Sequence, residues 1–220
     1  YYASRGLGDV YKRQVKIYYE HYFDDHSQMF FQYGRWKDGH IGLEITFPKN
    51  RFIDTFVYEG LGTKDQTGPM LYDSFWGEFE EQISAKDNYY NHYLYQGWQH
   101  WGMGIGNPLL PGPIYNKNGQ ITFISNRVLA HHIGFCGSPC QSLSYRMLLS
   151  YSRHWGTYDN PLNEIKKQFN SLFEVTYAPQ QLKGWSFTVS GAMDRGSLLG
   201  NNYGGMLVIR KQGIIKSGNK

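Results

Sequence analysis

The sequence predicts an all-β fold and, within that class, an antiparallel up-and-down β-barrel of the outer-membrane type. Three observations support this: an aromatic-rich composition, alternation of apolar and polar residues, and connections whose lengths differ between the two ends of the strands. Charged residues make up 18% of the chain and aromatic residues 17%, with 26 glycines. Aromatic residues favour strands and glycines favour turns, so this composition favours sheets over helices. No run of apolar residues approaches the roughly 18 that a transmembrane helix needs.

Alternation begins at Val15 and continues to about Gly213. In the clearest segment, Leu143, Tyr145 and Met147 alternate with polar residues such as Ser144 and Arg146, as expected for a strand with one apolar face. Turn residues separate the runs at 37–39, 48–50 and 137–139. The pattern predicts about nine strands, at 15–23, 28–36, 40–47, 51–62, 121–135 (irregular near Asn126), 143–152, 169–177, 185–194 and 203–213.

The predicted connections differ in length between the two ends of these strands. If the last strand ends on the periplasmic side, the connections on the outer side are 63–119, 156–166, 195–202 and the short 37–39 turn. The inner side then has only the short connections 24–27, 48–50, 137–140 and 179–183. Outer-membrane barrels combine short periplasmic turns with longer outer loops, whereas a two-sheet sandwich has no reason to sort its loops in this way. The alternation alone does not decide whether the apolar face is a core or faces lipid.

The chain divides into three regions in this interpretation. Residues 1–14 share no pattern with the rest and look like translated adapter sequence, so we interpret them as a non-native extension. Residues 15–215 are expected to form a partial barrel, and 216–220 a C-terminal tail. An odd number of strands is expected for a fragment, because bacterial single-chain barrels have even numbers.

Charge, cysteine and histidine patterns exclude several functions. The net charge is only +4 and there is no basic run, so nucleic acid is not an expected partner. Cys136 and Cys140 lack the paired spacing of a zinc site, and the sequence leaves open whether they form a disulfide or stay free thiols. His131 and His132 point to opposite faces of a strand and cannot bind one metal together. No metal or other cofactor is predicted.

Five segments of the chain carry a family resemblance: FDDHSQMFFQYGRWKDGHIGLEITFPKNR (23–51), DNYYNHYLYQGWQHWGMGIGNPLL (87–110), RVLAHHIGF (127–135), LLSYSRHWGTYDNPL (148–162) and MDRGSLLGNNYGGMLVIRKQG (193–213). They resemble capsule-assembly proteins of the Wzi family, and the resemblance extends over nearly everything after Gln14. The resemblance implies the C-terminal half of that family's barrel, located in the Gram-negative outer membrane, with lipid and capsular or surface polysaccharide as partners.

The predicted outer loop carries a candidate polysaccharide site. Sugar recognition uses flat aromatic faces against the C–H side of a pyranose ring and planar amide or imidazole groups for its hydroxyls. The segment 87–101 is dense in both, although such aromatic residues can also simply pack a loop against a barrel rim. The candidate ligand-binding residues are Asn91, His92, Trp98, Gln99, His100 and Trp101.

Two other functions remain open at this point. A β-rich surface carbohydrate-active enzyme would use an aromatic loop to line a cleft, and a passive outer-membrane pore would need an organised charge pattern in its lumen. Asp159 and Glu164 form the kind of carboxylate pair that glycoside hydrolases use, but they lie in predicted loop sequence, where solvated carboxylates are ordinary. The sequence has no nucleophile-elbow pattern either. We therefore expect no catalytic residues and no enzymatic activity.

Overall fold

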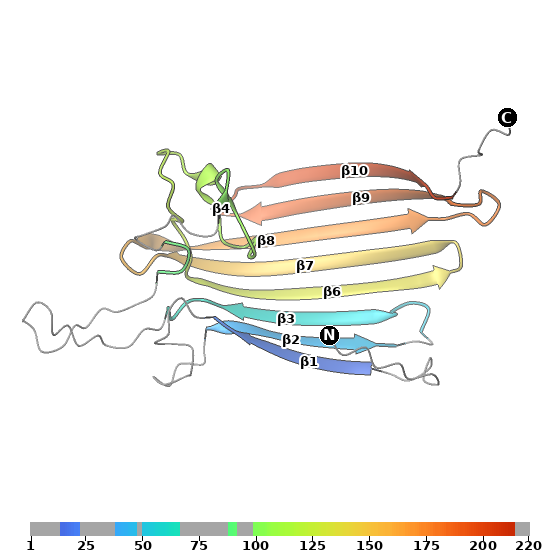
Figure 1. The fold of residues 1–220 in the computed structure, drawn as a ribbon, viewed down its shortest axis with the longest axis horizontal. Helices are drawn as coiled ribbons and strands as arrows, with labels where there is room; N and C mark the ends of the chain where they lie inside the picture. The colour runs from blue at the N-terminus through green and yellow to red at the C-terminus, as the bar shows by residue number, and fades with distance from the viewer. Residues whose placement is uncertain (1–13, 23–37, 48–49, 67–87, 92–98, 214–220) are drawn as a thin grey trace, which may run out of the picture.

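The computed structural model describes residues 14–22, 38–47, 50–66, 88–91 and 99–213, which form an all-β structure (Figure 1). The long strands are β1 (Gln14–His21), β2 (Gly39–Thr46), β3 (Thr55–Gly62), β6 (Val128–Cys140), β7 (Leu143–Gly156), β8 (Pro161–Tyr177), β9 (Trp185–Gly196) and β10 (Asn202–Lys211). Two short strands, β4 (Gln99–His100) and β5 (Met103–Gly104), and a 3-10 helix, η1 (Pro113–Tyr115), lie between β3 and β6. Within the described ranges, no helix is long and apolar enough to span a membrane.

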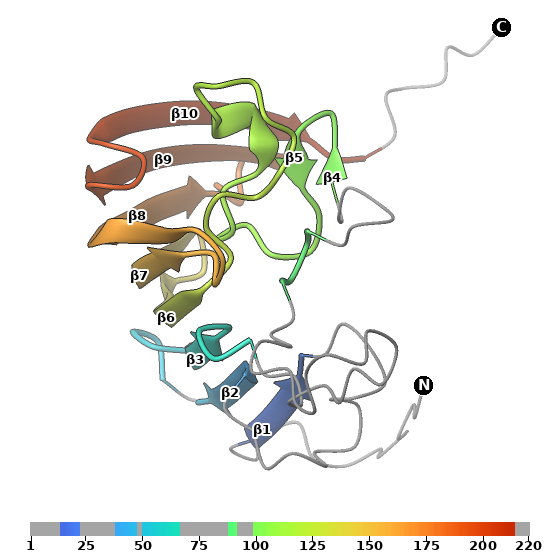
Figure 2. The ribbon, with the colours of Figure 1, turned by 90° about the vertical axis from the view of Figure 1, so that its left-hand side faces the viewer.

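The long strands form one eight-stranded antiparallel sheet in the order β1-β2-β3-β6-β7-β8-β9-β10. Each long strand therefore pairs with the next long strand along the chain, as the up-and-down prediction required. Viewed from one end, the strands follow an arc, and the segment that carries β4 and β5 lies on the concave side (Figure 2). In the described part of the chain, β1 and β10 are the two edges of the sheet. The all-β class and the antiparallel arrangement are thus confirmed.

Connections between the long strands alternate between two ends of the sheet (Figure 1). The loop end holds 22–38, 63–127, 157–160 and 197–201, and the turn end holds 47–54, 141–142 and 178–184. The predicted strand 28–36 lies outside the described residues. Because β1 pairs directly with β2, no strand separates them in the sheet. The predicted turn 24–27 also lies outside the described residues.

The predicted strand 121–135 and the turn that follows it are misplaced. The strand β6 begins only at Val128 and continues through the predicted 137–139 turn to Cys140. Gly137 pairs with Tyr145 and Cys140 pairs with Leu143, with an irregularity in the register between these pairs. Proline has no N–H to donate to a neighbouring strand. A residue in a bulge does not have to donate such a bond, so Pro139 is tolerated in the irregular part of β6.

The predicted outer loop 156–166 is also wrong, because β8 begins at Pro161 and pairs there with Gly156. Glu164 accordingly lies in a strand, not in a loop. This part of β8 lacks alternation because its side chains lie beyond the apolar part of the sheet. A strand that is exposed to water on both faces carries no periodic hydrophobic signal.

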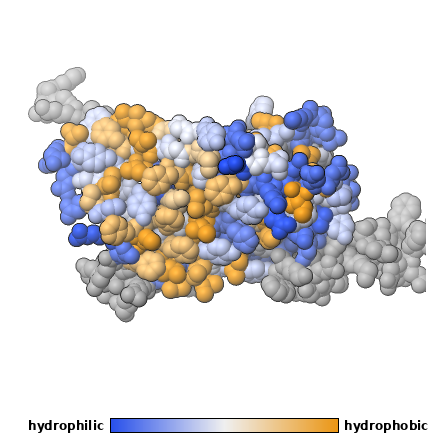
Figure 3. Space-filling view, turned by 180° about the vertical axis from the view of Figure 1, so that it is seen from behind, coloured by the Kyte–Doolittle hydropathy of each residue, from blue (hydrophilic) through white to orange (hydrophobic). Residues whose placement is uncertain are grey.

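The two faces of the sheet have opposite character. On one face Tyr145 lies opposite Val175, Val175 opposite Val189, and Val189 opposite Leu207. This is the convex face, and seen from behind it presents a broad apolar area bordered by hydrophilic residues (Figure 3). Val189 is 60% exposed and Leu207 64% exposed. The register confirms the predicted separation of apolar and polar side chains onto opposite faces. Arg146, Glu174 and Ser190 lie opposite one another on the concave face.

Candidate functional site

A row of polar side chains crosses the concave face. Glu59 on β3 lies opposite His132 on β6, which lies opposite Ser150 on β7. Asn170 on β8 and Asp194 on β9 continue the row. Directly opposed residues share a face, and here they also interact: His132 Nδ1 lies 2.6 Å from Ser150 Oγ, and Asn170 Nδ2 donates to Asp194 Oδ1 at 2.7 Å. The register thus gathers hydrogen-bonding groups from five neighbouring strands of the sheet.

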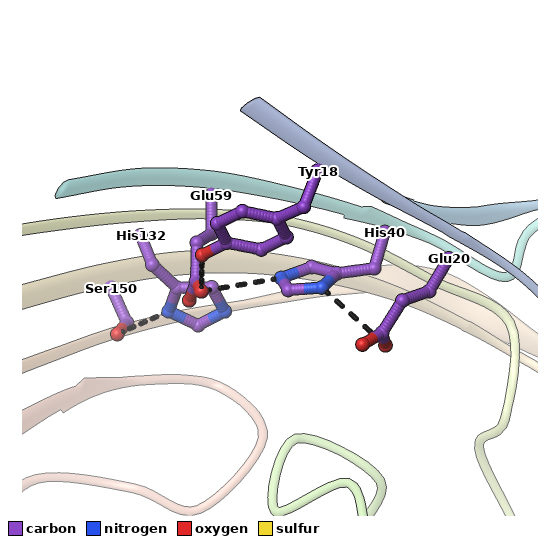
Figure 4. A network of polar contacts seen from close by, with 6 residues as sticks. All are labelled: Tyr18, Glu20, His40, Glu59, His132 and Ser150. Carbon is purple, nitrogen blue, oxygen red and sulfur yellow. Dashed lines mark hydrogen bonds and ion pairs between the residues drawn. The ribbon is translucent and has the colours of Figure 1, made fainter. Parts of the chain in front are cut away.

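At the β1 side of the row, a histidine lies between two carboxylates (Figure 4). His40 Nε2 is 3.6 Å from Glu59 Oε1, and His40 Nδ1 is 3.7 Å from Glu20 Oε2. Tyr18 donates its hydroxyl proton to the same Glu59 oxygen. A neutral imidazole has one N–H and can donate to only one of the two carboxylates, whereas an imidazolium can donate to both.

The segment 99–127, called the roof here, covers the concave face at the loop end. Leu110 and Phe123 of the roof form a buried cluster with Leu61, Val128 and Ala130 of the sheet. Leu61 and Ala130 are opposite each other on β3 and β6, on the same face as Glu59 and His132. The hydrophobic core of the described structure is therefore small and lies between the roof and the polar side of the sheet.

Buried polar contacts hold the roof in place. Asn126 is fully buried, and its Nδ2 donates to Asn88 Oδ1 at 2.6 Å and to the Tyr89 carbonyl at 2.5 Å. Its Oδ1 accepts from Gln66 Nε2 at 2.6 Å. Tyr89 in turn donates to Asp38, just before β2, at 2.9 Å. Burial raises the pKa of the Asp38 carboxyl above its ordinary value.

Between the roof and the sheet lies a cavity of about 590 Å³, within the range of small-molecule sites. Its sheet wall is polar except for Leu61, and its roof wall is mostly apolar. The sheet contributes Glu20, His40, Glu59, His132, Ser150, Ser152, His154, Gln168 and Asn170, and the opposite wall includes Pro108, Leu109, Pro111, Tyr115, Leu198 and Leu199.

The charges in the cavity are acidic. Glu20 and Glu59 contribute carboxylates, and no lysine or arginine is among the described residues that line the cavity. His40, His132 and His154 provide ring nitrogens to the same wall. No group of three or more His, Cys, Asp or Glu side chains in the described ranges is arranged to hold a metal ion.

Smaller cavities continue from this one along β6 and β7 toward the turn end. A cavity of about 320 Å³ shares Glu59, His132 and Ser150 with the large one. Another of about 220 Å³ shares Cys136 and Arg146 with that second cavity. Both cysteines of the chain, Cys136 and Cys140, are free thiols in the structure. The polar face thus carries a series of adjoining cavities along the strands.

The four described residues of the predicted outer-loop site, Asn91, Gln99, His100 and Trp101, do not line the large cavity. Asn91 exchanges two 2.8 Å hydrogen bonds with the backbone of Phe123, through its Nδ2 and Oδ1, and so fastens the roof. Gln99 Oε1 accepts from the Gly102 N–H at 2.8 Å. The rings of His100 and Trp101 meet edge to face at 6.2 Å, with Trp101 86% exposed. His92 and Trp98 lie outside the described residues, so a binding surface there stays a prediction.

Sequence reasoning did not identify the polar row as a site. Glu59, His132, Ser150 and Asn170 each appear in the sequence as one polar position in an alternating strand. Strand alternation could have placed each of them on the polar face. Only the register shows that they are neighbours. His131 and His132 do point to opposite faces as expected: His131 contacts Tyr58, whereas His132 contacts Ser150.

Comparisons with protein-family models, with curated proteins and with solved structures found no match to this chain.

Proposed function

We propose that the chain is part of an outer-membrane β-barrel that binds or anchors capsular or other surface polysaccharide. The convex face contacts lipid, and the loop end faces the cell exterior. One observation carries the proposal: the roof and its cavity lie on the polar face of the sheet, while the apolar face stays exposed. A sheet in water buries its apolar face and leaves the polar face to solvent, so this arrangement favours a lipid environment.

The length of the apolar stretch along the strands also supports a lipid environment. On β7 the convex residues from Leu143 to Tyr151 are apolar or aromatic. This stretch covers nine residues, and a tilted strand needs about 9–11 residues to span the hydrocarbon core of a bilayer. Tyr177 and Trp185 lie at strand ends on the turn-end side, where aromatic residues mark a membrane interface.

The cavity supports a carbohydrate ligand. A pyranose ring has an apolar C–H face and a rim of hydroxyls, and the cavity opposes an apolar roof wall to a polar sheet wall. Hydroxyl, amide and imidazole groups on the sheet can donate to and accept from sugar hydroxyls. Because Glu20 and Glu59 give the cavity acidic charge, uncharged sugar residues fit it better than uronic acids.

The proposed activity is binding, not catalysis. Glu59 already accepts a hydrogen bond from Tyr18 and contacts His40 through the same oxygen, an arrangement that fixes the carboxylate in place. Incubating the protein with capsular polysaccharide should therefore release no reducing ends. Release of reducing ends that depends on Glu59 would support the enzyme alternative instead.

Filling the cavity tests the proposal. Ser150 lies at the centre of the polar wall, so Ser150→Phe places a ring where the ligand would lie. We expect the full-length variant to assemble in the outer membrane and to retain at least tenfold less surface polysaccharide, a loss of about 1.4 kcal/mol in binding. Ser144→Phe is the matched control, because Ser144 lies on the same face and strand but lines the small turn-end cavity.

Unchanged polysaccharide retention in an assembled Ser150→Phe variant would contradict a site under the roof. If Trp101→Ala lowers retention under the same conditions, the sugar binds the exposed loop surface that the sequence predicts.

A further inference from the structure

Basic residues lie next to one another on the convex face at the loop end. Arg153 on β7 lies directly opposite Lys167 on β8. Arg195 on β9 lies opposite Phe169, two residues from Lys167 on the same face. Like charges on opposed positions of neighbouring strands repel and destabilise a sheet. In the described part of the chain none of these cations forms an ion pair that would offset the repulsion.

An aromatic ring positions part of this group. The Arg153 guanidinium lies 5.1 Å from the centroid of the Trp155 ring, and Lys64 Nζ lies 4.9 Å from the same centroid. Cation–π contacts of this kind orient a cation without neutralising its charge. The Nε of Arg153 is buried and has no hydrogen-bond partner among the described residues. The guanidinium is therefore held in place with donor capacity that the described chain does not use.

The level of these residues on the convex face matches the lipid headgroup layer. On β7, Arg153 follows the last residue of the apolar stretch, Tyr151, by two positions, or about 7 Å along the strand. The headgroup region extends about 5–8 Å beyond the hydrocarbon core on each side of a bilayer. Trp155 lies slightly further out, in the interfacial zone where tryptophan is enriched.

We infer that Arg153, Lys167 and Arg195 bind the phosphate groups of an anionic lipid in the membrane leaflet at the loop end. The inference rests on the proposed function, since only a lipid-facing convex face brings these residues to the headgroups. A guanidinium matches the geometry of phosphate oxygens with parallel, charge-assisted hydrogen bonds, and a phosphate between the strands replaces repulsion with attraction.

The experiment compares the binding of a phosphorylated lipid by the native protein and two triple variants. The full-length protein is inserted into phosphatidylcholine vesicles, and lipid A is titrated in while the thermal unfolding midpoint is followed. Arg153→Gln, Lys167→Gln and Arg195→Gln together should weaken lipid A binding at least tenfold, because each juxtamembrane cation contributes to the attraction. Lys183→Gln, Arg210→Gln and Lys211→Gln form the control, with the same chemical change at the turn end, and should keep the wild-type affinity.

Each outcome decides one question. Equal lipid A binding by the loop-end variant and the wild type would overturn the inference, as would equal losses in both triple variants. Wild-type protein that inserts but gains nothing from lipid A also overturns the inference, while the barrel proposal stands. Failure to insert into any vesicle counts against the barrel itself. Equal stabilisation by inorganic phosphate at the same concentration would assign the cations to free phosphate instead of lipid.

Discussion

Polar residues provide most of the buried anchoring at the loop end. His154, Gln168 and Asn126 are among the largest fully buried side chains of the described structure, beside Phe123. A buried polar group is tolerated only where its hydrogen bonds are made, so these residues define one arrangement of the roof more strictly than apolar packing would. Gln168 shows this directly, because its Oε1 accepts from the Leu199 N–H at 3.1 Å and fixes the 197–201 connection.

Asn126 is the residue whose loss should affect the roof most. In Asn126→Ala, Gln66 Nε2 and the Tyr89 carbonyl each lose their hydrogen bond to Asn126 in a buried environment. Asn88 Oδ1 also loses its bond from Asn126 but keeps the one from Asn91 Nδ2 at 3.1 Å. The expected cost to the roof is about 2–4 kcal/mol, from the two groups left unsatisfied, at about 1–3 kcal/mol each. Hydrogen exchange of the 99–127 amides should accelerate, while the exchange of β7 and β8 stays slow.

Asn118→Ala is the matched control, because exposed Asn118 accepts one hydrogen bond, from the Gln120 N–H. Its roof amides should exchange as in the wild type. Equal exchange rates in both variants would show that the Asn126 contacts do not hold the roof.

At the scale of elements, the sequence predicts strands well where one face is apolar, and poorly elsewhere. The strands β7, β9 and β10 begin within a residue of their predicted starts, because Leu143, Trp185 and Tyr203 open clear alternating runs. The sequence pattern did not predict the first residues of β8, because the residues near Glu164 face water on both sides of the strand. The segment 121–127 was wrongly included in a strand because its apolar residues, such as Phe123, pack in the roof and not on a sheet face.

The convex face of β7 offers a test of the membrane environment. Met147 lies on that face opposite Phe135 and Phe173, near the middle of the apolar area. Arginine at the midplane of a barrel costs about 2–4 kcal/mol, so Met147→Arg should strongly reduce the outer-membrane fraction of the full-length protein. Leu148→Arg, one residue away on the concave face, should assemble normally. Equal assembly of the two variants would mean that the convex face does not contact lipid.

At the scale of the whole molecule, the arrangement of the chain was partly predictable and the site was not. Alternation, together with the lengths of the connections, indicated an antiparallel meander with its longest connection at one end. Neither pattern contains the register, which alone brings Glu59, His132 and Ser150 into one row. Nor could alternation show that the roof would fold onto the polar face, since that choice depends on specific contacts of Asn91 and Asn126.

The long connection 63–127 has a consequence for the order in which the sheet forms. The strands β6 to β10 are joined by the short connections 141–142, 157–160, 178–184 and 197–201, so their contacts are local in sequence. Pairing β3 with β6 instead requires closure of 63–127, and each doubling of loop length adds about 0.6 kcal/mol of closure entropy. Local contacts form faster than distant ones.

During refolding into detergent micelles, amides of β7 and β8 should therefore become protected in pulsed hydrogen exchange before the amides that pair β3 with β6. Simultaneous protection of all these amides would mean that the sheet forms in one step. The expected delay has a further consequence: until β3 pairs with it, β6 has an unpaired edge that can bind strands of other chains.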